Sequence, residues 1–187
     1  LWVGEYYASG PGDALAIDYQ FTNGGARPVL VINKIWRMVE GKAKIDPDFV
    51  YAHVNSDGLL AIYKTMPNIP EGKSPTNLVA PYMTKVESGD RLSESITLQL
   101  PLLPYQEYFN NEPAEDSDGN KLVQTVKEVA FGLAFFVPPE GSKIWNEKAF
   151  GENVDLFHNP PGKRAQYGVL WSERFKVSVP VYRRKEA

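Results

Sequence analysis

The chain has 187 residues and a net charge of −3, with 15 Pro, 15 Gly and no Cys. The absence of Cys excludes disulfides, thiolate metal sites and a thiol nucleophile. The slightly acidic balance argues against nucleic-acid binding, which requires a concentrated basic surface. No apolar run approaches the roughly 20 residues of a membrane-spanning helix. The content of Pro, Gly and aromatic residues is typical of strands joined by turns.

Three strands are predicted at the start of the chain. Residues 2–8 form the first, and a turn follows at 9–13. Apolar and polar residues alternate strictly through 15–22, which predicts a half-buried antiparallel strand. After a turn at 23–28, the strand predicted at 29–38 begins with consecutive apolar residues, so we expect it to be covered on both faces.

A polar connection and a hairpin come next. The connection is predicted at 40–47, and short strands at 49–54 and 59–64 then flank a turn of Asn, Ser, Asp and Gly. Such residues tolerate the positive φ that tight hairpin turns require. The following run, 66–81, is rich in Pro, which lacks the N–H that a central strand needs. We expect an extended crossing segment or a sheet edge there.

One further strand precedes the longest irregular segment. A turn at 88–90 leads into 92–102, where alternate residues are apolar. The segment 105–121 then combines aromatic and acidic residues without a regular period. Loops this long are uncommon inside compact domains and are usually functional or disordered.

The stretch 126–137 predicts the central strand of the protein. Its bulky apolar residues share one parity, and they are Val129, Phe131, Leu133, Phe135 and Val137. Small residues occupy the other parity, at Ala130, Gly132 and Ala134. Because alternate side chains point to opposite faces of a strand, one face must be buried in the core. The bare face admits the close approach of another backbone or side chain.

The C-terminal part completes an all-β pattern. Residues 143–157 suit one short strand or a helical turn, and 169–181 predict the last strand. About eight or nine strands without a long helix indicate a two-sheet antiparallel β-sandwich. We expect one domain over 1–187, whose length beyond the ~100 residues of an immunoglobulin-type domain lies in insertions near 65–87 and 104–121.

Two segments resemble bacterial immunoglobulin-like domains. Residues 17–23 followed by Pro28-Val29-Leu30-Val31 look like the second and third strands of such domains. Residues 86–90 leading into Ile96-Thr97-Leu98 look like the Gly-Asp turn before a later strand. The resemblance implies an immunoglobulin-like sandwich, although the paired cysteines of antibody domains are absent, and it carries over no functional residue.

The loop at 104–121 is the predicted binding site, because it combines aromatic rings with carboxylates and amides. Such rings stack on sugars or anchor a protein partner, whereas the structural alternative is that they close the open end of the sandwich. The predicted binding residues are Tyr105, Tyr108, Phe109, Asn110, Glu112, Asp116 and Asp118. The Pro-rich segment 65–81 is a second candidate edge for the partner.

Two other kinds of site have weaker support. His53 and His158 are the only histidines, and neither lies in a nucleophile motif or at His-x-x-x-His spacing. A hydrolase or a metal-binding protein using one of them is a minor alternative, and no catalytic residue is assigned. Residues 116–120 have the alternating oxygen donors and the Gly of a calcium loop but lack its remaining ligands. Calcium is therefore the only cofactor weighed, and an ordinary acidic turn is favoured over it.

These observations predict a non-catalytic binding or assembly module that contacts a protein partner. We expect it to work outside the cytoplasm, in a bacterial cell envelope. The main alternative is a carbohydrate-binding module, which requires a planar row of aromatic rings to hold an oligosaccharide. An enzyme requires a concave pocket that gathers His53 or His158 with carboxylates.

Overall fold

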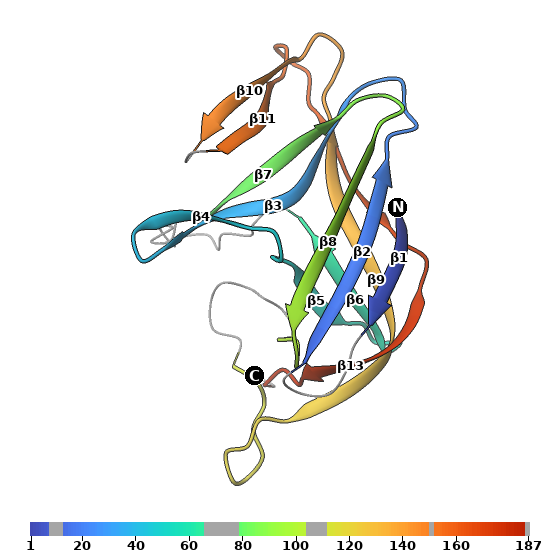
Figure 1. The fold of residues 1–187 in the computed structure, drawn as a ribbon, viewed down its shortest axis with the longest axis vertical. Helices are drawn as coiled ribbons and strands as arrows, with labels where there is room; N and C mark the ends of the chain where they lie inside the picture. Colours follow the sequence, from blue (N-terminus) through green and yellow to red (C-terminus); the bar gives the residue numbers. More distant parts are fainter. Residues whose placement is uncertain (8–12, 66–78, 104–111, 150–151, 186–187) are drawn as a thin grey trace.

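The computed structural model describes residues 1–7, 13–65, 79–103, 112–149 and 152–185 (Figure 1). Every regular element in these ranges is a β-strand, as the sequence predicts, and none of them contains an apolar helix of membrane-crossing length. The strands are β1 (Trp2–Tyr7), β2 (Ala14–Thr22), β3 (Val29–Val39), β4 (Lys42–Asp46), β5 (Tyr51–Val54), β6 (Leu59–Lys64), β7 (Val79–Val86), β8 (Arg91–Gln99), β9 (Val123–Val137), β10 (Lys143–Ala149), β11 (Glu152–His158), β12 (Gln166–Trp171) and β13 (Phe175–Tyr182).

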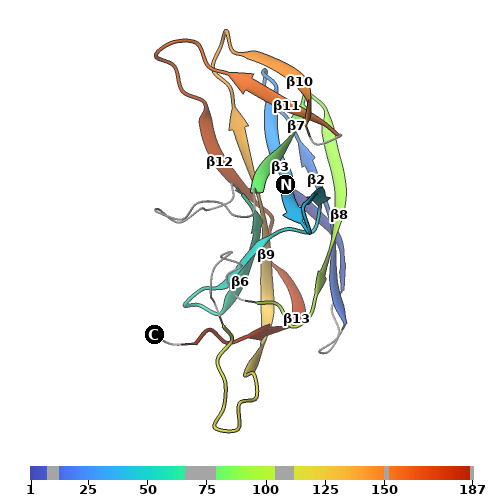
Figure 2. The same cartoon turned by 90° about the vertical axis from the view of Figure 1, so that its left-hand side faces the viewer.

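The strands form two facing layers and a hairpin. One layer is the three-stranded sheet β1-β2-β8, and the other is an eight-stranded sheet whose main path is β4-β3-β9-β6-β5. In the large sheet β7 also pairs with β3, and both β12 and β13 pair with β9. Figure 2 shows β2 and β8 on one side of β9 and β6. The separate pair β10-β11 stands at one end of the molecule (Figure 1).

The core lies between the two layers, where the period-two pattern of the sequence places it. The inward side chains of β2 are Leu15, Ile17, Tyr19 and Phe21, and all are buried. They face Val129, Phe131 and Leu133 of β9, which are completely buried, and the rings of Tyr19 and Phe131 lie 4.8 Å apart. Burying each large apolar side chain contributes roughly 1.5–3 kcal/mol. The central strand predicted at 126–137 is therefore confirmed.

The polar connection predicted at 40–47 is wrong, because Lys42–Asp46 forms β4. Glu40 and Gly41 have φ values of 51° and 72° and join β3 directly to β4, with Val39 opposite Lys42. Two consecutive positive φ values are typical of the tight two-residue turns that connect antiparallel strands. The polar composition of β4 reflects its place at the end of the main strand path, where one face meets water.

Two predictions in the C-terminal part are also wrong. Residues 143–157 hold two paired strands, β10 and β11, instead of one strand or a helical turn. The single strand predicted at 169–181 is divided into β12 and β13, both on β9. At the division, Ser172 bonds Phe131 twice, because its N–H donates to the Phe131 carbonyl at 2.8 Å and its Oγ accepts from the Phe131 N–H at 3.0 Å.

The Pro-rich segment and the strand directions differ partly from expectation. Residues 66–78 of the Pro-rich segment lie outside the described residues. Within the insertion predicted near 65–87, Val79–Val86 is strand β7, which pairs with β3 alone among the described strands. Pro81 lies opposite Ile35 there, consistent with an edge position. One pair in the otherwise antiparallel sheets is parallel, β6 with β9, so the predicted purely antiparallel sandwich holds only as a mostly antiparallel one.

Candidate functional site

Aromatic side chains gather on the outer face of the large sheet, which points away from the three-stranded sheet. We call this group the aromatic surface. Its members on the sheet are Tyr63, Phe136, Tyr167 and Trp171, and Phe157 of β11 packs against Phe136 from the separate hairpin. Two rows of ring contacts cross it. In one row the rings of Tyr63 and Trp171 lie 5.6 Å apart, and in the other the ring of Phe136 lies 5.2 Å from Tyr167 and 5.7 Å from Phe157.

The bare face of β9 is what lets two of these side chains approach the sheet closely. A Cβ added at Gly132 would come within 2.9 Å of the Trp171 ring and 3.0 Å of the Tyr63 Cβ. Real side chains do not pack so closely, so only Gly leaves room for both neighbours. The close approach expected from the sequence at this parity is thus confirmed, and Trp171 and Tyr63 are the residues that make it.

Tyr167 and Trp171 are the exposed members of the surface. Tyr167 is 49% exposed and Trp171 is 44% exposed. The hydroxyl of Tyr167 shares a hydrogen bond with Thr65 Oγ1, which ties β12 to the end of β6 across β9. Large exposed aromatic groups that are held in place by such contacts are typical anchors of binding surfaces.

Strand β12 presents an edge that lacks the usual protection against pairing. Among the described strands it pairs only with β9, in an unbroken register from Gln166 to Trp171. Natural edge strands carry charges, Pro or bulges that discourage further pairing. The six residues of β12 include no charge, no Pro and no bulge. Leu170, whose side chain is on the inward face of the strand, is 38% exposed. No described strand pairs with its other side.

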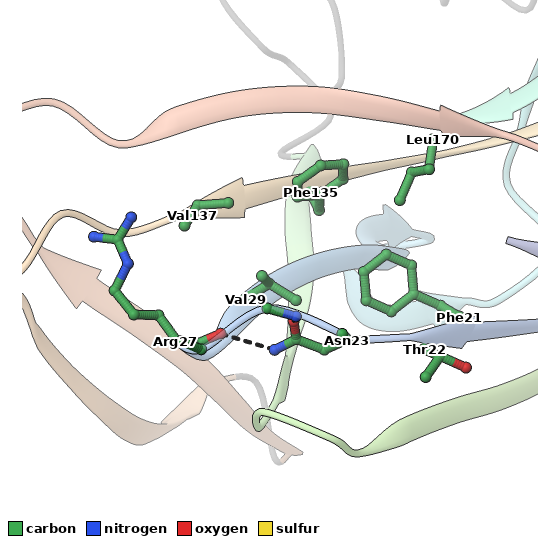
Figure 3. Close-up of a pocket in the computed structure, with 11 residues that line it drawn as sticks. Phe21, Thr22, Asn23, Arg27, Val29, Phe135, Val137 and Leu170 are labelled. Atoms are coloured by element: carbon green, nitrogen blue, oxygen red, sulfur yellow. Dashed lines mark hydrogen bonds between the residues drawn. The ribbon is translucent and has the colours of Figure 1, made fainter.

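A pocket of about 330 Å³ lies between the layers, beside β12 (Figure 3). Its apolar walls come from β2, β3, β9 and β12, and they are Phe21, Val29, Phe135, Val137 and Leu170. The β2–β3 loop, residues 23–27, supplies the polar remainder. Phe21 and Phe135 are neighbours, with ring centroids 6.0 Å apart.

The loop beside the pocket is held by Asn23, which is 4% exposed. Its side-chain Nδ2 donates to the carbonyls of Arg27 at 2.8 Å and Val86 at 3.0 Å, and its Oδ1 accepts from the Gly25 N–H at 3.0 Å. Its backbone is also paired with the β7–β8 turn, because Asn23 N donates to the Asp90 carbonyl. Every polar group of this buried residue has a partner, so Asn23 ties the loop to β7 and to the β7–β8 turn.

A partly buried polar cluster links the two layers. Glu94 of β8 is its centre, since Oε2 accepts from the Tyr19 hydroxyl at 2.6 Å and Oε1 accepts from Asn33 Nδ2 at 2.8 Å. Lys34 Nζ lies 3.1 Å from Glu94 Oε1. Asn33 is the extra residue at a register shift in β3, and its free carbonyl accepts from Lys64 Nζ at 2.6 Å.

The amine of Lys64 is perturbed by its surroundings but is out of reach of a ligand. Burial lowers its pKa to about 8, although the nearby carboxylates of Glu94, Asp48 and Asp46 act in the opposite direction. Burial, with the negative charge and the hydrogen bond of Glu94, raises the pKa of Tyr19. Perturbed groups of this kind mark active sites when they line a cleft. Lys64 is 2% exposed and does not line the described pocket.

The predicted binding loop is described only in part. Tyr105, Tyr108, Phe109 and Asn110 lie outside the described residues, so their role stays a prediction. The described end of the loop contains Glu112, Asp116 and Asp118, all exposed. The structure does not place these three beside the aromatic surface or the pocket by any described contact.

The acidic turn at 116–120 uses its first carboxylate internally. Asp116 Oδ1 accepts from the N–H groups of Asn120 at 2.8 Å and Asp118 at 3.0 Å, and Oδ2 accepts from Asn120 Nδ2. The hydrogen bonds from Asn120 lower the pKa of Asp116. Glu115 and Lys121 form an ion pair that closes the turn. Within the described ranges, no group of three or more His, Asp or Glu is arranged to hold a metal ion.

The two histidines lie on different elements and do not line the pocket beside β12. His53 is on β5, where its ring meets Tyr63 edge-on at 5.7 Å. His158 ends β11 opposite Lys143 and is exposed. The arrangement needed for the hydrolase alternative, a pocket that gathers a histidine with carboxylates, does not occur in the described pocket.

Comparison with protein-family models, curated proteins and solved structures finds no match for this chain. The site is therefore defined by geometry alone. Sequence reasoning did not assign Tyr63, Tyr167 or Trp171 to a site. The signal available in the sequence was the row of small residues on one face of 126–137. It indicated that a neighbour lies close to this face but did not identify the neighbour.

Proposed function

We propose that this chain is a non-catalytic binding module that receives an extended segment of a protein partner along β12. The observation that carries the proposal is the unprotected edge of β12 beside two exposed aromatic residues, Tyr167 and Trp171. Alternate residues of an antiparallel edge strand direct their N–H and C=O groups away from the sheet. An added strand satisfies those groups, and its side chains then reach both faces of the sheet.

The two faces beside β12 offer different contacts to such a segment. On the outer face, side chains of the partner meet Tyr167 and Trp171. On the inner face they meet Leu170, which is exposed at the mouth of the pocket. Main-chain hydrogen bonds provide affinity in this mode of binding, and contacts to alternate side chains provide specificity.

The ring geometry favours a protein partner over an oligosaccharide. A flat sugar-binding platform requires rings that share a plane. The planes of Tyr63 and Trp171 are inclined by 59°, and those of Phe136 and Tyr167 by 54°. Inclined rings form an irregular apolar surface, which suits the side chains of a polypeptide.

We also propose that the domain is immunoglobulin-like and that it is located outside the cytoplasm, in a bacterial cell envelope. Their support is the sequence resemblance of residues 17–23 and 86–90 to bacterial immunoglobulin-like domains. The mostly antiparallel sandwich is compatible with that class. Secretion and localisation of a tagged full-length chain in its source cell tests the placement directly.

A matched pair of substitutions tests the binding surface. Trp171→Ala removes a 44% exposed ring beside the β12 edge, and Trp145→Ala removes a 43% exposed ring from β10. The wild-type chain, used as bait in affinity purification, should retain a partner. The control variant Trp145→Ala should retain the same partner. Trp171→Ala should weaken capture at least tenfold, because central aromatic anchors contribute about 2 kcal/mol or more. Equal capture by both variants would contradict the proposal.

A further inference from the structure

The pocket beside β12 is polarised from one end to the other. Figure 3 shows Arg27 beside Val137 at one end, with Phe21 and Leu170 at the other. Phe135 lies between these ends, over the middle of the pocket. The exposed Arg27 therefore places a cation at one end of a pocket whose larger side chains are apolar. The pocket has about 330 Å³ of space, near the lower limit of the roughly 300–1,000 Å³ typical of small-molecule sites.

The charge of Arg27 is not neutralised within the described part of the chain. Its Nη1 donates to the Pro138 carbonyl at 3.3 Å, and no carboxylate among the described residues forms an ion pair with it. The described residues that line the pocket include no Asp or Glu. A guanidinium has five N–H donors arranged to receive a carboxylate or a phosphate, and four of them remain for a ligand.

We propose that this pocket binds a small anionic amphiphile, a molecule with an apolar chain and a carboxylate or phosphate head. The head pairs with Arg27, and the chain extends over Phe135 toward Phe21 and Leu170. Asn23 prepares the site by fixing the loop that carries Arg27. The inference goes beyond the proposed function, since its ligand is a small molecule and its site is between the layers.

Titration calorimetry with octanoate, below its critical micelle concentration, tests the proposal. Saturable binding with one ligand per chain is expected, and hexanoate should bind about fifteenfold more weakly, since each buried methylene contributes about fourfold in affinity. Octanol, which lacks the charge, should bind at least fivefold more weakly than octanoate. Octyl phosphate in a parallel titration shows which head is preferred.

Two matched pairs of variants assign the binding to this pocket. Leu170→Asp places a negative charge at the mouth and should abolish octanoate binding, whereas Leu103→Asp, at a residue of similar exposure, should not. Arg27→Gln should remove the difference between octanoate and octanol, whereas Arg164→Gln should preserve it. Melting temperatures of all four variants, measured beside the titrations, confirm that each chain is folded.

Three results would overturn the proposal. The first is that the wild-type chain shows no saturable octanoate binding. The second is that it binds octanoate and octanol with equal affinity. The third is that Leu170→Asp and Leu103→Asp lose equal octanoate affinity. Vesicles of phosphatidylglycerol and of phosphatidylcholine distinguish a free ligand from a membrane surface. If the first result is accompanied by sedimentation with phosphatidylglycerol vesicles, the partner is a lipid surface instead.

Discussion

Lys64 shows how a single buried amine couples the stability of this fold to pH. Its Nζ donates to the carbonyls of Asn33 and Pro47, and a neutral amine has two N–H groups, enough for both. Loss of the proton therefore keeps both hydrogen bonds and removes the cost of a buried charge. The pKa of Lys64 is about 8 in the folded chain, against 10.5 for an ordinary lysine.

The sign of the pH dependence follows from these pKa values. Between about pH 8 and 10.5 the unfolded chain holds more protons at Lys64 than the folded chain does, so the free energy of unfolding rises with pH. The full gain is about 3 kcal/mol. Above pH 10 the raised pKa of Tyr19 acts in the opposite direction, because only the unfolded chain ionises there.

We expect the free energy of unfolding of the wild-type chain to increase between pH 8 and 10 relative to Lys64→Met. Methionine has no titrating group and similar length, so the variant should lack this rise. Urea denaturation of both chains at half-unit pH steps measures the difference. A constant difference from pH 7 to 10 would show that Lys64 does not titrate in this window.

Gly132 is the residue on which the aromatic surface depends. Gly132→Val adds a branched side chain where Trp171 and Tyr63 already lie, and overpacking of this kind costs typically 1–3 kcal/mol. We expect the Trp171→Ala background to reduce that cost by more than half, because the ring that clashes is gone. A double-mutant cycle from denaturation measures the coupling. Additive effects of the two substitutions would contradict the packing described.

At the scale of elements, the β2–β3 loop depends on the buried amide of Asn23. Asn23→Ala leaves the Val86 carbonyl without its donor and frees the Gly25 N–H, which should cost about 2 kcal/mol of unfolding free energy. Gln20→Ala is the control, since its amide bonds Ser93 at the surface and its loss should cost about 0.5 kcal/mol. Chemical denaturation of the two variants measures both losses of unfolding free energy. Equal losses would mean that Asn23 is not the anchor of this loop.

The strands that sequence reasoning found have a local signal, which is a run of apolar residues, a flanking turn or a strict alternation of apolar and polar residues. Residues 15–22 and 126–137 show this alternation, and both are strands of the sandwich with the predicted faces inward. Strand β4 was missed because its turn is only Glu40 and Gly41, and the strand itself is polar. At the division between β12 and β13, Ser172 and Phe131 exchange hydrogen bonds, a contact between distant residues that has no local signal.

On the scale of the whole molecule, the sandwich architecture was predictable and the candidate site was not. Alternation fixes which faces of a strand are buried, but it leaves open which strands become neighbours. The aromatic surface exists because β12 and β6 flank β9 at Gly132. The polar cluster similarly exists because a bulge at Asn33 faces Lys64. Both depend on the order of strands in the sheet, which the sequence pattern does not contain.

The central claim is that a protein partner adds to the edge of β12, and hydrogen exchange tests it most directly. Amide exchange is measured by mass spectrometry for the chain alone and for its purified complex with the captured partner. We predict that exchange slows on binding in residues 166–171, with little change in 104–121. Slower exchange confined to 104–121, with 166–171 unaffected, would contradict the claim and would restore the loop predicted from the sequence as the binding site.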